Sequence, residues 1–110
     1  MTARADKIAK LNDEFRQSVQ PGSHIYMTQG IQALLPEDRL AILGLLRTFN
    51  DFSEDNDPYG EHDFGAIEHN DDRVFWKIDY YDKSLQYRSE DPTDPEVTAR
   101  VMTIMLAHEY

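Results

Sequence analysis

The residues best suited to chemistry form one short run, Glu61-His62-Asp63. Carboxylate and imidazole groups are the ligands that Zn, Mn and Fe accept in proteins. These three residues are therefore candidate metal ligands, and a divalent cation is the one cofactor that the pattern could hold. No organic cofactor is predicted. The candidate binding residues of the loop as a whole are Asp55, Asp57, Tyr59, Glu61, His62 and Asp63.

Two features of the loop argue against a metal. Asp55, Asp57 and Gly60 stand at positions one, three and six of a calcium-binding loop, but Ala66 occupies the place of its bidentate glutamate. Consecutive side chains also cannot all point inward without a special backbone conformation. The alternative interpretation is a solvated acidic loop.

Acid–base chemistry is the second candidate, because a predicted hairpin brings Asp79 near the same residues. A turn at Asn70-Asp71 places residues 61–63 close to the end of the following strand. Crowded carboxylates have raised pKa values, as an acid catalyst requires. His62 and Asp79 are therefore candidate catalytic residues. The alternative is that Asp79 pairs with Lys77 or Arg73 and that His62 caps the loop.

The negative charge of the chain is concentrated in one segment. The formal net charge is −10, and residues 51–72 hold nine acidic groups and no Lys or Arg. Such a field repels nucleic acid phosphates, so direct nucleic-acid binding is not expected. It attracts a basic protein surface. The plainer interpretation is a loop that keeps the protein soluble.

The composition excludes several other classes of function. The chain has no cysteine, which rules out disulfides, thiolate metal sites and a cysteine nucleophile. It has no phosphate-binding loop and no Gly-x-Ser-x-Gly element. No apolar run approaches the roughly 18 residues of a membrane span, and the N-terminus lacks the apolar core of a signal peptide. A cytoplasmic protein with no membrane partner is expected. The oligomeric state is not predicted.

The periodicity of apolar residues predicts one α+β domain, residues 1–110, with a three-stranded sheet and three helices. Strict alternation in Val74, Trp76, Ile78 and Tyr80 indicates a strand with one buried face. The expected elements are helix 2–19, strand 24–28, helix 36–49, strand 64–68, strand 73–81 and helix 94–110. Their order is helix, strand, helix, strand, strand, helix.

Two of the expected helices have distinctive patterns. In helix 36–49, six apolar residues cover more than half of the circumference, which predicts a central helix packed on more than one side. Gly44 costs this helix about 1 kcal/mol relative to alanine, and close approach of another backbone or sequence drift would explain it. In helix 94–110, Asp94 and Pro95 provide a cap and first turn, and residues 97, 101, 104 and 105 form a stripe.

Several long strings carry a resemblance to a known family. They read NDPYGEHDFG, FWKIDYYD and DPEVTARVMTIMLAHEY, with LNDEFRQ and TQGIQALLP upstream. The chain resembles an uncharacterised family of small acidic alphaproteobacterial proteins that are often carried on plasmids and other mobile elements. That resemblance implies no assigned activity. By association it implies roles such as plasmid maintenance or protection from host defences.

Two functions follow from these observations. The favoured one is a small acidic interaction protein that docks on a basic, nucleic-acid-binding partner protein. The alternative is a small metal-dependent or acid–base enzyme with its carboxylate and histidine site at residues 61–63. The interaction protein is favoured because no complete catalytic motif is present.

Overall fold

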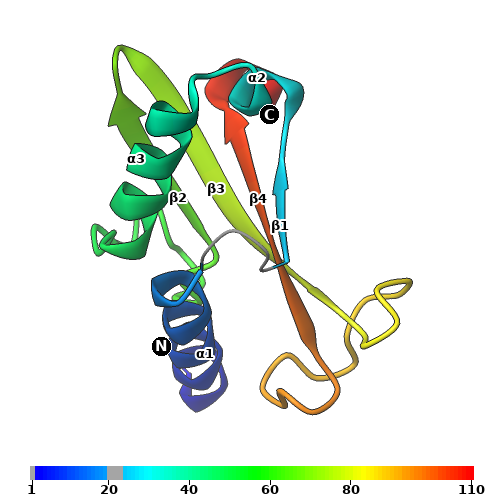
Figure 1. Ribbon diagram of the computed structural model, residues 1–110. Helices are drawn as coiled ribbons and strands as arrows, with labels where there is room; N and C mark the ends of the chain where they lie inside the picture. The colour runs from blue at the N-terminus through cyan, green and yellow to red at the C-terminus, as the bar shows by residue number, and fades with distance from the viewer. Residues whose placement is uncertain (1, 20–23) are drawn as a thin grey trace.

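The computed structural model describes residues 2–19 and 24–110 (Figure 1). Its elements in chain order are α1 (Ala3–Gln17), β1 (Ile25–Met27), α2 (Gln29–Gln32), α3 (Pro36–Arg47), β2 (Phe64–His69), β3 (Asp72–Tyr81), β4 (Ala99–Leu106) and the short 3₁₀ helix η1 (Ala107–Glu109). The α+β class is as predicted. Helix α1 begins at the expected cap, because the Thr2 hydroxyl accepts a 3.0 Å hydrogen bond from the Ala5 backbone N–H.

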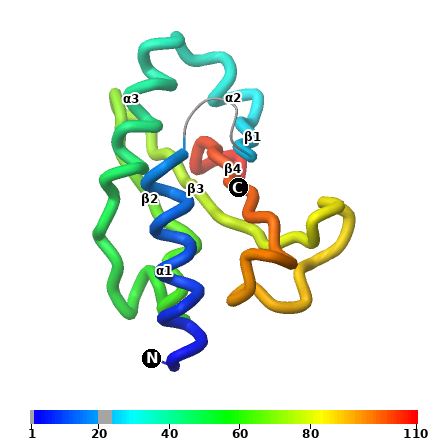
Figure 2. The backbone as a smooth tube through the Cα atoms, turned by 60° about the horizontal axis from the view of Figure 1, so that its bottom comes forward, coloured from blue at the N-terminus to red at the C-terminus, as the bar shows by residue number. Residues whose placement is uncertain are grey.

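A four-stranded mixed sheet in the order β1-β4-β3-β2 forms the centre of the protein. Strand β1 runs parallel to β4, and the other neighbours are antiparallel. The core lies where α1 and α3 approach one face of this sheet (Figures 1 and 2). There the alternating Val74, Trp76 and Ile78 of β3 meet Ile42 and Leu46 of α3. The predicted inward face of β3 is therefore confirmed.

The β2–β3 hairpin has the predicted register. Asn70 and Asp71 form its two-residue turn with φ values of 50° and 67°, the left-handed conformation that such turns need and that Asn and Asp tolerate. Glu68 lies opposite Arg73 and Phe64 opposite Lys77. One step beyond the strand, the Ile78 N–H donates to the Asp63 carbonyl oxygen at 2.8 Å. Residues 61–63 consequently lie beside the end of β3, as expected.

The predicted C-terminal helix is wrong. Residues 99–106 form strand β4, and the sheet therefore has four strands rather than three. Strand β4 is hydrogen-bonded on both sides, by β1 and β3, and most of its residues are buried on both faces. A strand buried on both faces has no alternation of apolar and polar residues. Its apolar run therefore matches helical spacing by coincidence, and Asp94-Pro95 lies in turns.

The segment before β2 also departs from expectation in two places. Residues 29–32, expected as a connection, form the short helix α2. Helix α3 is not packed all round: Ile42, Leu43 and Leu46 are buried, but Leu40 is 60% and Leu45 is 41% exposed. Helix α3 therefore covers the sheet with one face and presents apolar side chains on the other. None of the described helices is both long and apolar enough to span a bilayer.

A close contact between Gly65 and Trp76 fixes how the hairpin meets the core. The two residues are cross-strand partners, and the indole is fully buried. A Cβ atom at position 65 would lie 2.5 Å from the Trp76 Nε1 atom. Only glycine therefore fits beneath this indole ring.

We expect the Gly65→Ala substitution to lower the free energy of unfolding by about 3 kcal/mol, because the buried indole cannot move without displacing the core. Gly44→Ala is the matched control. A Cβ atom at position 44 meets nothing within 4 Å. At low protein concentration, we therefore expect Gly44→Ala to raise the free energy of unfolding by about 1 kcal/mol. Urea unfolding of both variants measures the difference. Equal effects of the two substitutions would contradict the packing described for Trp76.

Candidate functional site

The acidic loop, residues 51–60, is held in one conformation by its own polar groups. The Asn56 side chain donates to the Asp51 carbonyl oxygen at 2.7 Å and accepts from the Ser53 backbone N–H at 2.8 Å. The Asp57 carboxylate is 4% exposed and accepts the His62 backbone N–H, with N–O distances of 3.2 and 3.3 Å. Asp57 is thus an internal support of the loop rather than a free ligand.

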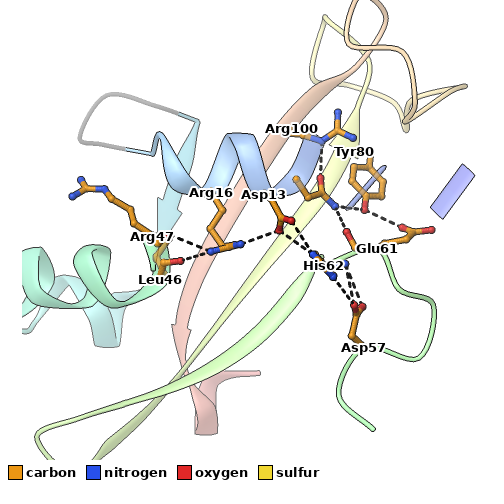
Figure 3. A network of polar contacts seen from close by, with 10 residues as sticks. Asp13, Arg16, Leu46, Arg47, Asp57, Glu61, His62, Tyr80 and Arg100 are labelled. Atoms are coloured by element: carbon orange, nitrogen blue, oxygen red, sulfur yellow. Dashed lines mark hydrogen bonds and ion pairs between the residues drawn. The ribbon is translucent and has the colours of Figure 1, made fainter. Parts of the chain in front are cut away.

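His62 connects this loop to helix α1 (Figure 3). Its Nδ1 atom lies 2.9 Å from an Asp13 oxygen, and its Nε2 atom lies 3.6 Å from an Asp57 oxygen. The imidazole stacks on Phe52 with a centroid separation of 3.9 Å and an interplanar angle of 2°. A φ of 57° places its backbone in the left-handed region, which is costly for a residue with a side chain. The imidazole contacts therefore hold a backbone conformation that His62 would otherwise avoid.

A second set of contacts, centred on Asn12, lies beside His62. The Asn12 side chain is fully buried; it donates to the Glu61 carbonyl oxygen at 2.9 Å and to the Tyr80 hydroxyl at 2.8 Å. Its oxygen accepts from Arg100 Nε at 2.6 Å. The Tyr80 hydroxyl in turn donates to the Glu61 carboxylate at 3.0 Å. One amide thereby joins helix α1 to strands β3 and β4 and to the end of the loop.

Burial shifts the titration of two members of this cluster. Desolvation raises the pKa of Tyr80, and the carboxylates of Asp63 and Glu61 raise it further. The phenol therefore stays protonated and remains the donor to Glu61. Desolvation lowers the pKa of Arg100, while Tyr80 and Glu61 oppose that change. The guanidinium also donates to the Pro92 carbonyl oxygen at 2.7 Å, which ties the loop before β4 to the same cluster.

Arg16 extends the network toward α3. It is 1% exposed and donates to the Leu46 carbonyl oxygen and to Asp13, both at 2.9 Å. Its guanidinium carbon lies 5.5 Å from the ring centroids of both Phe52 and Trp76, a distance at which aromatic faces attract cations. Asp13 is thus shared between Arg16 and His62, and the carboxylate has a charged partner whichever form the imidazole takes.

Asp63 lies apart from His62, in a hollow of about 230 Å³ at the end of the hairpin. The hollow is lined by Asp63, Ile78, Asp79, Tyr80, Tyr81 and Arg88. Partial burial raises the pKa of Asp63, and the Glu61 carboxylate raises it further, with smaller effects from Asp57 and Asp79. Asp79 also lies 3.2 Å from Lys77 Nζ, which is the predicted alternative to a catalytic role.

The structure does not bring the three candidate metal ligands together. Glu61 contacts Tyr80, His62 contacts Asp13 and Asp57, and Asp63 lines the hollow with Asp79. Within residues 2–19 and 24–110, no group of three His, Asp or Glu side chains is arranged to hold a metal ion. Asp63 and Asp79 do share one site, as the hairpin register predicted, but His62 belongs to a different one.

Several other residues of the acidic loop face solvent. Asp51, Glu54 and Asp55 are exposed, and Tyr59 is 80% exposed. Glu54 and Tyr59 line a shallow hollow together with Thr2 and Pro58, at the start of α1. The loop therefore presents three carboxylates and one aromatic side chain to solvent, on a backbone supported from within.

Four residues that contact His62, Glu61 or each other were not predicted from the sequence: Asn12, Asp13, Arg16 and Arg100. A signal was present for two of them. Asn12 and Arg16 follow Ile8 at spacings of four, and all three lie on the buried line of α1. Polar residues on such a line need buried partners. Arg100 gave no signal, because its segment was assigned to a helix.

Comparison with known proteins gives one match. Residues 27–109 match the family described as "Protein of unknown function (DUF3768)". The matched region includes the loop, the hairpin and β4, and it excludes α1. No curated protein and no solved structure matches the chain.

The contacts of His62 lead to a stability prediction. His62→Ala removes the Asp13 contact and the ring stacking, and it leaves alanine at a φ of 57°. We expect the free energy of unfolding to fall by about 2 to 3 kcal/mol. His62→Asn, which tolerates the left-handed backbone, should lose less. The exposed His108 provides the control, and His108→Ala should change stability by less than about 0.5 kcal/mol. Urea unfolding with equal midpoints for the two alanine variants would show that His62 does not hold the loop.

The raised pKa of Asp63 leads to a pH prediction. A carboxyl whose pKa is raised on folding destabilises the protein when it ionises, and the penalty vanishes once the pH falls to the unfolded value of 3.8. We therefore expect Asp63→Asn to be more stable than the wild type at neutral pH, and this gain to disappear as the pH approaches 3.8. Thermal unfolding across this range measures it, with the exposed Asp55→Asn as control. A neutral-pH gain no larger than that of the control would contradict the raised pKa.

Proposed function

We propose that this chain, which belongs to the DUF3768 family of proteins of unknown function, is a small acidic interaction protein. Its acidic loop, residues 51–60, docks on a basic surface of a partner protein. The observation that carries the proposal is the division of the loop into two parts. Asp57 is buried and supports the backbone, whereas Asp51, Glu54, Asp55 and Tyr59 face solvent.

The internally supported backbone of the loop favours a role in binding over a role in solubility alone. A loop that only keeps a protein soluble gains nothing from buried supports, and the left-handed conformation at His62 costs stability. A docking loop does gain, because a surface that is already ordered loses less conformational entropy on association. Tyr59 adds an exposed aromatic side chain of the kind that anchors protein interfaces.

The charge of the loop defines the class of partner. Residues 51–72 contain no Lys or Arg, so the loop attracts basic surfaces over a distance and raises the association rate with them. Nucleic-acid-binding proteins have such surfaces, and the carboxylates would occupy positions that phosphates normally take. The resemblance to proteins of alphaproteobacterial plasmids and other mobile elements favours the same class, since those elements depend on nucleic-acid-binding proteins.

Acid–base catalysis at the hollow of Asp63 is the second candidate function. The observation in its favour is a partly buried carboxyl of raised pKa that shares a hollow with Asp79 and Arg88. The pH dependence of the Asp63→Asn variant tests whether that carboxyl can hold a proton above its usual range. His62 has no part in this candidate, because its ring contacts α1 and the acidic loop instead.

The docking proposal predicts a site-specific loss of binding to a basic probe, for which we choose a fluorescently labelled oligo-arginine peptide. The test variant removes three exposed loop charges through Asp51→Asn, Glu54→Gln and Asp55→Asn. We expect the dissociation constant to rise about tenfold, because each exposed charge pair contributes about 0.5 kcal/mol. Wild-type binding should also weaken as salt is added. Fluorescence anisotropy measures both effects.

The matched control removes the same number of exposed charges elsewhere, through Glu14→Gln, Glu90→Gln and Glu96→Gln. This variant should bind within about twofold of the wild type, since exposed charges away from the contact act only through the screened long-range field. If both triple variants lose the same affinity, binding follows net charge alone and the loop is not a docking surface.

A further inference from the structure

Helix α3 presents an apolar face to solvent that the fold does not use. Leu40 is 60% and Leu45 is 41% exposed, and Ala41 between them is also exposed. No charged residue occurs between Arg39 and Arg47. In Figures 1 and 2 the helix lies at the periphery of the molecule, and none of the described elements lies outside it. Burial of such a face against a partner would be favourable.

Gly44 lies in the middle of this face, and no contact within the described part of the chain requires glycine there. A Cβ atom at this position would meet nothing within 4 Å, so neither a close contact nor a turn requires glycine here. Glycine nevertheless costs a helix about 1 kcal/mol relative to alanine. The sequence pattern left close approach of another backbone as one explanation. Among the residues that the structure describes no backbone approaches this position, and that explanation therefore requires a second molecule.

We propose that two copies of this chain associate through the exposed face of α3, with the two helices antiparallel about a twofold axis. The choice of a second copy rests on the oppositely charged ends of α3, which complement one another in a twofold pair. Each copy has a formal net charge of −10, so two copies repel one another through most of their surfaces. Repulsion is least where the facing surfaces are uncharged, as residues 40–46 are.

The antiparallel arrangement follows from the ends of α3. Its first turn contains Glu37 and Asp38, and its last turn contains Arg47. Antiparallel packing places the acidic end of each helix beside the basic end of the other. The dipoles of two antiparallel helices also attract one another. Parallel packing would place acidic ends together. Asp38 and Arg47 also have contacts within the chain, to His69 and to the Val19 carbonyl oxygen, whereas Glu37 is exposed. The charges of the two ends therefore favour the antiparallel pair.

The helical positions of the face fit this arrangement. At about 100° per residue, Ala41 and Gly44 occupy the centre of the face, and Leu40 and Leu45 flank them on either side. A twofold axis midway between residues 41 and 44 places Ala41 of one copy opposite Gly44 of the other. Two small residues in register allow the helix axes to approach closely, while the leucines pack around them. This inference does not depend on the function proposed for the acidic loop.

Sedimentation velocity over a concentration series tests the proposal. The wild-type protein should pass from the mass of one chain to that of two as concentration rises. Gly44→Glu should raise the dimer dissociation constant at least tenfold, roughly, because it puts a carboxylate at the centre of an apolar contact. Its fold should be unaffected, since the side chain enters open space and glutamate is the better helix former. Thermal unfolding of dilute protein checks this.

Gln17→Glu is the matched control, because it adds the same charge at an exposed position of α1. It should dimerise as the wild type does. A wild-type protein that stays monomeric at every concentration overturns the proposal. So does a dimer that Gly44→Glu leaves intact, since the contact then lies on another face.

A cross-linking experiment gives an independent readout that does not rely on loss of association. The chain has no cysteine, so Ala41→Cys introduces the only thiol, close to its counterpart across the proposed twofold axis. Under mild oxidation this variant should form a covalent dimer readily, and Gln17→Cys should not. Equal cross-linking of the two variants would mean random collision and would contradict the proposed face.

Discussion

The side chain of Asn12 is the contact on which the rest of the arrangement depends. Its two donors and its acceptor are all used, by Glu61, Tyr80 and Arg100. These partners come from the residue that follows the acidic loop and from two strands, whereas Asn12 itself is on the first helix. When every donor and acceptor of a buried amide is hydrogen-bonded, any displacement of the amide leaves several polar groups without partners. The network therefore favours one arrangement of these elements. The position of α1 against the sheet follows from this requirement.

The same helix also supports the C-terminal end of the acidic loop through His62. Directly after Asn12 on α1, Asp13 contacts His62, and one turn beyond Asn12, Arg16 donates to the end of α3. The loop is therefore fixed by contacts at its base, and repulsion among its carboxylates need not unfold it. Because the supporting contacts and the exposed charges belong to different residues, a segment of high negative charge can remain ordered. The buried carboxylate of Asp57 supports the loop backbone, and the exposed carboxylates can contact a partner.

Much of the fold could be predicted from local chemistry, and the failures have physical causes. The β2–β3 hairpin was predictable because one face of β3 is buried and its turn residues tolerate a left-handed backbone. Strand β4 was not, since most of its side chains are buried on both faces of the sheet, which erases the alternation that identifies a strand. For the candidate site, the register placed Asp63 near Asp79 correctly. The contacts of His62 were missed because they depend on how α1 packs, which no local pattern encodes.

The central claim is that the acidic loop is held in one conformation by its internal supports, and amide hydrogen exchange tests it most directly. The Gly60 N–H donates to the Asp57 carbonyl oxygen and the His62 N–H to the Asp57 carboxylate. We predict that both amides exchange at least about a hundredfold more slowly than those of an unstructured peptide, because their exchange requires the loop to open. Exchange of both at the unstructured rate would show a freely moving loop and contradict the account.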